Sequence, residues 1–537
     1  MKDSSSVIQI PLLNQSSGPF AKSLCRLSLV ASLAGLLAAC GGGGGSGGGG
    51  SFIGGGNTDA WSAGVYKDSE RFENQCEKPR VGASKITGIP YPDRKGSLLL
   101  EKNWLRSWSH ETYLWYNELP DINPANKDTA EEYFQRLVTP LLTANGAPKD
   151  KYHYADPTEL SEARYIAGRT YGYGLGLVFY STYPPRDLRV AYVESGSPAA
   201  LAGIKRGAKI LKVDGIDLVN DNTATGVDAL NAGLSPADLG AVHTFEVKEI
   251  NASSARSVTL QSAEITTVPV FMNKVLETNT GKVGYIVFNS HIQTAEQQFY
   301  EVINNFKAQG INDLVLDLRY NGGGLIDLAA AVGYMIAGDK SLNKTFEQLV
   351  FNNKFQPESP IQFTSVGNFG VTKMLALPTL NLSRVFILSA AGTCSASESI
   401  INGLRGINVE VILIGEQTCG KPYGFIPTDN CGTTYSTIQF RGENAKKYGD
   451  YSDGFIPSSN DNQKDRVKGC LMDDDFSNEL GDANDKLLSA ALYYRINNAC
   501  VTNTSSSKVR QKMRQVDNEI PGLPLQEDWM SRKIYMQ

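Results

Sequence analysis

Three short segments carry the residue types that an acyl-transfer reaction needs. The first reads TCSASE over residues 393–398 and holds the hydroxyl of Ser395. The second reads GEQTCGK over residues 415–421 and ends in the amine of Lys421. The third reads DLRYNGGG over residues 317–324, and glycines of this kind expose backbone N–H groups to an oxyanion. Together the segments offer a nucleophile, a base and an oxyanion hole.

Each of the two reactive side chains also has a simpler explanation. A lysine acts as a base only when it is neutral, so we expect burial to lower the pKa of Lys421. A solvated loop charge is the alternative for Lys421 taken alone. Ser395 precedes a predicted helix, where negative charge is stabilised, but helix capping is the alternative for this hydroxyl. The two assignments therefore depend on the three segments occurring together.

Short apolar runs predict how the three segments are positioned. Apart from Asp317, residues 314–318, 385–388 and 411–414 are apolar, as strands of a sheet covered on both faces require. A segment with reactive residues follows each of them, and helical patterns lie between them. Because loops at strand carboxyl ends can share one sheet edge, we expect the three segments to converge. The sequence therefore predicts an α/β layer over residues 270–500.

Two further folded regions are predicted before this layer. Residues 57–165 contain an apolar face at three- and four-residue steps from Leu100 to Trp115, and a capping box that begins at Thr129. We therefore expect a mostly helical N-terminal domain. Residues 168–265 are short apolar runs split by Gly, Pro and Asp, which is typical of a small β-rich domain.

The β-rich region resembles a PDZ domain. A glycine-rich stretch precedes a β-rich run, and VESGSPAALAGIKRGAKILKVDGIDL follows at residues 193–218. The resemblance implies that backbone N–H groups of the stretch bind a peptide carboxylate, while the next strand accepts an extended peptide. A domain that only packs as a lid is the alternative. The stretch consists of Tyr173, Gly174, Leu175, Gly176 and Leu177.

The three motifs, in this order and behind a PDZ-like region, resemble the C-terminal processing peptidases, also called tail-specific proteases. The resemblance implies a multidomain serine endopeptidase with a Ser/Lys dyad and a ClpP/crotonase-like core. It implies Ser395 as the nucleophile and Lys421 as the base. The oxyanion hole would take N–H groups from Ala396 and from Gly323 or Gly324. Protein or peptide substrates recognised through their C-termini are the implied partners, and no cofactor is implied.

The sequence departs from the family pattern beside the base. Many members place Gln or Glu four residues after the lysine, where Phe425 stands here. The residue that orients the dyad is therefore unassigned, and Glu416 and Gln417 are candidates. Related tricorn-like proteases use a serine and a histidine, and His291 is the histidine positioned for that role. A Ser/Lys dyad and participation of His291 both stay open.

Two classes of function fit these features. The first is an active peptidase that cuts exported proteins near their C-termini. The second is a catalytically weak PDZ-bearing lipoprotein, in which the peptidase core serves as a scaffold or peptide-binding module. The presence of both Ser395 and Lys421 favours the first. A periplasmic binding protein for small ligands is not supported, because its two-lobed repeat pattern is absent.

The N-terminal residues predict export and anchoring. Residues 1–40 contain basic residues, an apolar run too short to span a bilayer, and a final LAAC that resembles a lipobox. A plain signal peptide that happens to end at a cysteine is the alternative. Lipidation of Cys40 would tether the protein through the glycine-rich linker 41–56. The expected location is the bacterial cell envelope, facing the periplasm, with inner or outer membrane left open.

Composition limits the remaining classes. Of the 537 residues 41% are hydrophobic and the net charge is −5, so an ordinary globular protein is expected and nucleic-acid binding is not. The four histidines lack metal-site spacing and no cysteines form a CxxC pair, so no metal is predicted. The acidic run 473–475 is a weak calcium candidate, since acidic loops are usually solvated. Residues 501–537 are expected to form a polar tail.

The cysteines favour disulfides. Two of the eight, Cys25 and Cys40, belong to the export segment, which leaves six in an exported chain. Six cysteines allow fifteen pairings, and the sequence does not choose among them. At least one disulfide is expected to involve Cys431 or Cys470, because both lie in a long polar segment, 426–480, interpreted as an addition to the family core.

Overall fold

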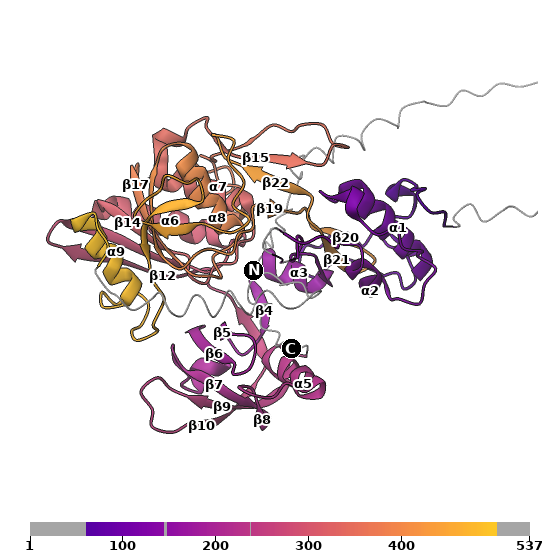
Figure 1. Ribbon diagram of the computed structural model, residues 1–537, viewed down its shortest axis with the longest axis horizontal. Coiled ribbons are helices and arrows are strands. Elements are labelled where there is room, and N and C mark those ends of the chain that lie inside the picture. The colour runs from indigo at the N-terminus through magenta and orange to yellow at the C-terminus, as the bar shows by residue number, and fades with distance from the viewer. Residues whose placement is uncertain (1–60, 144–145, 147, 237, 502–537) are drawn as a thin grey trace, which may run out of the picture. The chain divides into compact units, whose positions relative to one another are not determined.

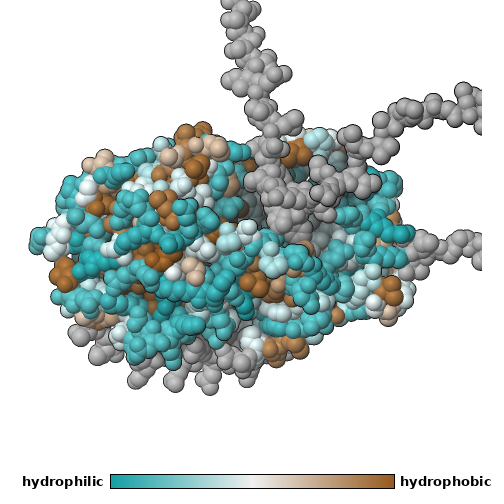
Figure 2. Space-filling model, turned by 90° about the horizontal axis from the view of Figure 1, so that it is seen from above, coloured by the Kyte–Doolittle hydropathy of each residue, from teal (hydrophilic) through white to brown (hydrophobic). Residues whose placement is uncertain are grey.

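The computed structural model describes residues 61–501 except 144–145, 147 and 237. The predictions for the export segment, Cys40, the linker 41–56 and the polar tail beyond residue 501 lie outside these residues. Within the described part, every helix is too short or too polar to cross a membrane. The face seen in Figure 2 is mostly hydrophilic, with scattered apolar patches.

A seven-stranded sheet with the order β12-β13-β14-β17-β18-β24-β23 forms the main layer. β12 pairs antiparallel with β13, and all other neighbours in this sheet are parallel. The apolar runs 314–318, 385–388 and 411–414 correspond to β14, β17 and β18. The bounds are β12 (Val270–Thr278), β13 (Gly281–Phe288), β14 (Asp313–Asp317), β17 (Arg384–Ser389), β18 (Glu410–Gly415), β23 (Ile456–Ser458) and β24 (Arg466–Leu471).

Helices cover both faces of the main sheet, which explains the continuous apolar strands. On one face, Leu314 and Leu316 of β14 share an apolar core with α6, α7 and α8. On the other face, Val315 belongs to a second core together with residues of α9. Figure 1 shows α9, in yellow, apart from the other three helices. The bounds are α6 (Ala295–Gln309), α7 (Ile326–Ala337), α8 (Ala396–Gly406) and α9 (Lys486–Asn497).

The region 168–265 folds around an apolar core of its own. Its sheet has the order β10-β9-β7-β6-β5, with β8 paired to β7, so β5 is an edge strand. β4 and β11, where the chain enters and leaves, pair with each other. The bounds are β4 (Arg169–Gly172), β5 (Leu175–Ser181), β6 (Asp187–Val193), β7 (Lys209–Val213), β8 (Ile216–Asp217), β9 (Val242–Lys248), β10 (Arg256–Gln261), β11 (Ala263–Thr266), α4 (Pro198–Leu201) and α5 (Ala224–Leu234).

The expectation that residues 57–165 are mostly helical is wrong for the described part. The helix with the apolar face and the capping box at Thr129 are both present, but long irregular segments connect them. The core here is completed by Tyr435, far along the chain. The bounds are η2 (Ser69–Arg71), β1 (Gln75–Cys76), β2 (Arg94–Lys95), α1 (Leu98–Thr112), η3 (Tyr116–Glu118), α2 (Ala130–Gln135), β3 (Tyr154–Pro157) and α3 (Thr158–Tyr165).

The segment 426–480 is part of the fold rather than an addition to it, which corrects the sequence interpretation. β24 pairs with β18 inside the main sheet, β22 pairs with β15, and β21 pairs with β3 of the N-terminal region. The remaining bounds are η4 (Gly338–Ser341), β15 (Thr345–Phe351), β16 (Ile361–Gln362), η5 (Gly370–Thr372), β19 (Tyr423–Gly424), β20 (Thr428–Asn430), β21 (Thr433–Ser436) and β22 (Phe440–Glu443).

Three disulfides pair all six described cysteines. Cys431 bonds to Cys76 and Cys470 bonds to Cys500, so the prediction of a disulfide at Cys431 or Cys470 is confirmed at both positions. The third disulfide joins Cys394 and Cys419. The pairings connect segments 355, 30 and 25 residues apart in sequence, which the cysteine spacing alone does not reveal.

Candidate active site

The loops that follow β14, β17 and β18 meet at one edge of the main sheet, as predicted. The N–H of Cys394 and the hydroxyl of Ser397 both donate to the carbonyl of Asn321, at 3.1 and 2.9 Å. The N–H of Cys419 donates to the carbonyl of Thr393 at 3.0 Å. The segment with Ser395 is therefore bonded directly to each of the other two motif segments.

Ser395 stands at the N-terminus of α8 in an uncommon backbone conformation. Its φ of 54° and ψ of −119° are sparsely populated for a residue with a side chain, and such positions cluster at functional sites. The residue is half-buried, whereas its neighbours Cys394 and Ala396 are buried. The turn therefore presents the Ser395 hydroxyl beside the helix N-terminus, where negative charge is favoured.

A single buried carboxylate connects the serine loop to the lysine loop. Glu398 accepts hydrogen bonds from the backbone N–H groups of Ser395 at 3.1 Å, Gly420 at 2.9 Å and Lys421 at 2.8 Å. It also accepts from the hydroxyl of Thr418 at 2.5 Å. Burial raises the pKa of the Glu398 carboxyl, and the hydrogen bonds from Thr418 and the backbone oppose that rise.

The sequence analysis assigned no role to Glu398. The signal was present, because a glutamate three residues after a serine at a helix start is the capping-box pattern. What the pattern does not reveal is that the same carboxylate also binds the loop after β18. The backbone N–H groups of Ser395 and Lys421 thus donate to the same carboxylate.

Lys421 is buried among aromatic rings. Its side chain is 1% exposed, and Nζ lies 4.3 Å from the ring centre of Phe425 and 4.9 Å from that of Tyr152. The Tyr152 hydroxyl donates to the carbonyl of Gly420 at 3.1 Å, which fixes the ring against the lysine loop. Burial favours the neutral amine that a base requires, whereas ring faces favour the ammonium. Phe425, four residues after Lys421, therefore supplies a ring at the position where the family resemblance led us to expect Gln or Glu.

The glycines of the third motif pack against the serine and the histidine. A Cβ at Gly323, whose φ is 109°, would lie 2.7 Å from the Cβ of Ser395. A Cβ at Gly324, whose φ is 127°, would lie 2.4 Å from the carbonyl oxygen of His291. The N–H of Gly323 donates to Oδ1 of Asn321 at 2.9 Å, so that donor is already engaged.

His291 binds the glycine loop. Its Nδ1 lies 3.0 Å from Oδ1 of Asn321, and its backbone N–H donates to the carbonyl of Gly323 at 2.9 Å. The ring is completely buried, which lowers the pKa of His291 to about 4. Among the described residues the ring contacts Asn321 and Phe288 and makes no hydrogen bond to Ser395. These contacts fit a residue that holds the loop rather than the base.

The two candidates for orienting the dyad contact the loop after β17 and the carbonyl of Asp453. The carboxylate of Glu416 accepts from the N–H of Ala391 at 3.2 Å, and the amide of Gln417 donates to the carbonyl of Asp453. Glu398 is a further acidic residue at this edge, and its hydrogen bonds connect the backbones of both loops.

The central residue of the acidic run 473–475 is buried rather than solvated. Asp474 is buried and forms ion pairs with Arg206 at 2.8 Å and with Arg319 at 3.2 Å. These guanidinium groups hold the pKa of Asp474 well below its usual range, against the opposing effect of burial. Because Arg319 belongs to the DLRYNGGG motif, Asp474 stabilises the base of the glycine loop rather than offering a free calcium ligand.

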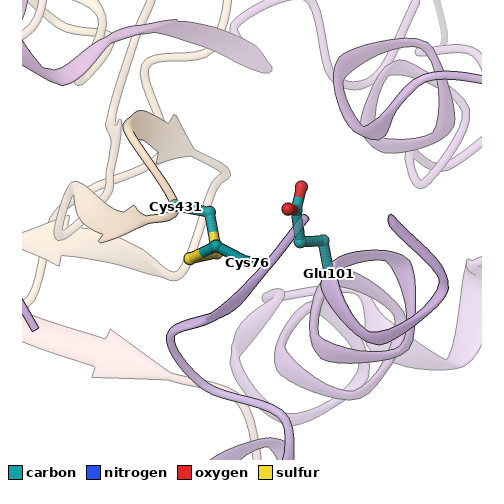
Figure 3. A group of neighbouring side chains, drawn as sticks. All are labelled: Cys76, Glu101 and Cys431. Atoms are coloured by element: carbon teal, nitrogen blue, oxygen red, sulfur yellow. A yellow bond between two sulfur atoms is a disulfide. The ribbon is translucent and has the colours of Figure 1, made fainter. Parts of the chain in front are cut away.

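Two groups of side chains resemble metal sites by proximity. Figure 3 shows Cys76, Cys431 and Glu101, and the second group is Cys394, Cys419 and Glu398. In both groups the cysteines are joined as disulfides, so their sulfurs are not the thiolates that bind metals. The disulfide in Figure 3 instead fastens the N-terminal region to the turn between β20 and β21.

The glycine-rich stretch of the β-rich domain is only partly a loop. Leu175, Gly176 and Leu177 already belong to β5. The Tyr173 ring is buried, and its hydroxyl donates to the carbonyl of Gly233 at 3.0 Å. Gly174 has a φ of 76°, and a Cβ there would lie 2.2 Å from that of Ser197. Only glycine therefore fits the turn that leads into the edge strand.

Comparison with known proteins identifies the family of this arrangement. The model for "Peptidase family S41" matches residues 282–427, and that for "Peptidase S41 N-terminal domain" matches residues 101–154. A carboxyl-terminal-processing protease of Picosynechococcus is 29% identical over 46% of this chain and 54% of its own length. Carboxyl-terminal-processing peptidase 3 of Arabidopsis thaliana is 26% identical over 64% of this chain and 66% of its own length.

A solved structure shares the fold. A putative S41 protease from Bacteroides fragilis superposes with a TM-score of 0.53 at 23% identity, over 76% of this chain and 98% of that one. The matches to the two curated relatives span about half to two thirds of their lengths. The motif order, the family models and these similarities agree: residues 282–427 match peptidase family S41, residues 101–154 match its N-terminal domain, and the chain is similar to the carboxyl-terminal-processing proteases.

Proposed function

We propose that this chain is a serine endopeptidase that cuts polypeptides near their C-termini, with Ser395 as nucleophile and Lys421 as base. The observation that carries the proposal is the carboxylate of Glu398, which binds the backbone N–H groups of both residues. A shared anchor of this kind holds a nucleophile and a base in register, as catalysis by orientation requires. The layered core fits the ClpP/crotonase-like arrangement that the family resemblance implies.

The reaction follows from the groups at this edge. The neutral amine of Lys421 takes the proton of the Ser395 hydroxyl while the oxygen attacks the substrate carbonyl. The negative charge that develops faces the N–H of Ala396 at the start of α8, with Gly324 as the second donor, since the Gly323 N–H is engaged by Asn321. The ammonium then protonates the leaving amine. Water, activated by the same lysine, releases the product from the acyl-enzyme.

The β-rich domain is proposed to capture the substrate as a PDZ domain does. β5 is an edge strand, so an extended peptide can pair with it without displacing a neighbour. The turn at Gly174 lies at the beginning of this strand, where the carboxylate of a peptide C-terminus would end. Peptides ending in apolar residues should therefore bind better than their C-terminal amides.

We further propose that the protein is exported and anchored through lipidated Cys40, with residues 1–40 as the signal and residues 41–56 as the tether. The three disulfides of the described part support an oxidising compartment such as the periplasm. Replacing Cys40 with serine should release the protein from membranes. If the Cys40→Ser protein stays bound after salt and carbonate washing, the anchor is assigned wrongly.

The proposed activity is tested with the purified soluble chain, residues 57–537, and an unfolded protein substrate. Product masses from the wild type should show cleavage that is absent from the Ser395→Ala variant. Binding of peptide C-termini without any Ser395-dependent cleavage would instead support a scaffold that has lost its peptidase activity.

A further inference from the structure

The disulfide between Cys394 and Cys419 lies inside the candidate active site. Cys394 directly precedes Ser395, and Cys419 stands two residues before Lys421. The bond therefore joins the loop after β17 to the loop after β18, with a Cα–Cα distance of 5.2 Å. The two reactive residues are each within two positions of a covalent crosslink.

The other connections between the two loops are hydrogen bonds. The N–H of Cys419 donates to Thr393, and Glu398 accepts from both loops. Glu398 is a buried carboxylate, and burial disfavours the charged form on which these bonds depend. A covalent bond beside them keeps the loops together when individual hydrogen bonds open.

Small displacements matter at this place. A nucleophile and its base must be within hydrogen-bond reach, and a misplacement of about 1 Å costs on the order of 100-fold in rate. We propose that the Cys394–Cys419 disulfide is a positioning crosslink of the peptidase site, which holds Lys421 against Ser395, so that full activity requires the oxidised form. This inference rests on the proposed peptidase function.

The crosslink is open to a dithiol reductant. Cys419 is half-buried, whereas Cys394 is 8% exposed. One thiolate of the reductant attacks Sγ of Cys419, the S–S bond breaks, and Cys394 leaves as a thiolate that takes up a proton. The second thiol of the reductant then displaces Cys419 from the mixed disulfide. The reductant ends as a disulfide, and its two electrons reside in the two protein thiols.

A second disulfide of the same chain supplies the matched control. Cys470 lies in β24, and with Cys500 it belongs to the apolar core that α9 covers, on the sheet face opposite α8. Removing this disulfide takes the same number of sulfur atoms from the fold without touching either catalytic loop. Loss of either disulfide can lower the general stability of the fold. Only loss of the Cys394–Cys419 disulfide should change the geometry of the dyad.

The experiment measures kcat and KM for the wild type, Cys394→Ala/Cys419→Ala and Cys470→Ala/Cys500→Ala, with and without dithiothreitol. We expect the Cys394/Cys419 variant to lose roughly 100-fold in kcat with KM changed less than about threefold. Its kcat/KM profile should shift to higher pH, because a looser lysine loop admits water. The control should keep kcat within about threefold. Dithiothreitol should lower kcat of the wild type and leave the Cys394/Cys419 variant unchanged.

The outcomes separate the inference from the function on which it rests. An inactive oxidised wild type, equal to Ser395→Ala, would overturn the proposed peptidase function. If the wild type is active and the Cys394/Cys419 variant matches it in kcat and pH profile, only the proposed positioning role of the disulfide is overturned. If that variant lacks a cooperative thermal transition, reduction of the folded wild type decides: unchanged kcat after complete reduction, verified by mass, contradicts the proposal.

Discussion

Two buried bases lie near Ser395, and their surroundings differ. Lys421 sits between aromatic rings on a loop that Glu398 and a disulfide fasten to the serine loop. His291 is equally buried, but its ring is bonded to Asn321 of the glycine loop. Burial alone therefore does not identify a base. The lysine shares the Glu398 carboxylate directly with the backbone of Ser395, whereas the histidine reaches the serine loop only through Asn321.

The largest expected effect comes from removing the dyad itself. Ser395→Ala and Lys421→Ala should each lower kcat by about 10⁴-fold or more, and the double variant should be no worse than either. Neither group works without the other, so their losses should not add. Single-turnover rates on one unfolded substrate measure this. Losses that multiply in the double variant would show that the two residues act independently.

Glu398 is the feature that the lysine side has and the histidine side lacks. Glu398→Ala leaves buried N–H groups without partners, at about 1–3 kcal/mol each, and frees both loops. We expect a loss of roughly 100-fold in kcat and a lower melting temperature. Glu398→Gln, which retains acceptor capacity, should recover part of both. Full activity in the alanine variant would mean that the two loops are positioned without this carboxylate.

We expect His291 to affect the pH dependence of folding stability rather than to act as the catalytic base. The native pKa of His291 is about 4 and the unfolded value about 6.5, so the unfolded chain binds the extra proton between these values. Stability should therefore fall as pH falls from about 6.5 to 4, by up to roughly 3 kcal/mol from this group. Urea unfolding at several pH values, compared with His291→Asn, measures it. An unchanged pH slope in the variant would contradict the assignment.

Phe425 offers the smallest and most specific change. Its ring face stabilises an ammonium by about 0.5–2 kcal/mol, and Phe425→Leu keeps the burial while removing that face. The neutral amine should then become easier to form. The midpoint of the kcat/KM profile should move to lower pH by about 0.4 to 1.5 units. A shift to higher pH would show that water enters the lysine pocket instead.

The sheet and the motif loops were predictable because local pattern decides them. β14, β17 and β18 are apolar on both faces since helices cover both, and chain order then places the loops at one edge. The roles of Glu398 and of the Cys394–Cys419 disulfide were not predictable. Each depends on contacts between segments some 25 residues apart, which residue types alone do not reveal.

The sequence-based expectations for the N-terminal region and for the acidic run 473–475 were wrong for a related reason. Tyr435 and Ile438 complete apolar clusters with residues of the N-terminal region, so its core is not encoded in its own pattern. Asp474 looks like a surface residue in the sequence, but it is buried and forms ion pairs with two arginines from distant segments. In both cases the partner lies far along the chain, where periodicity gives no signal.

The comparison of the two bases is decided most directly by kcat/KM of Lys421→Arg and His291→Ala on one unfolded substrate. A guanidinium cannot give up its proton near neutral pH, so Lys421→Arg should be as inactive as Lys421→Ala. His291→Ala should retain at least about a tenth of the wild-type value, because it loosens a loop without removing the base. Substantial activity in Lys421→Arg together with none in folded His291→Ala would make His291 the base and contradict the dyad assigned here.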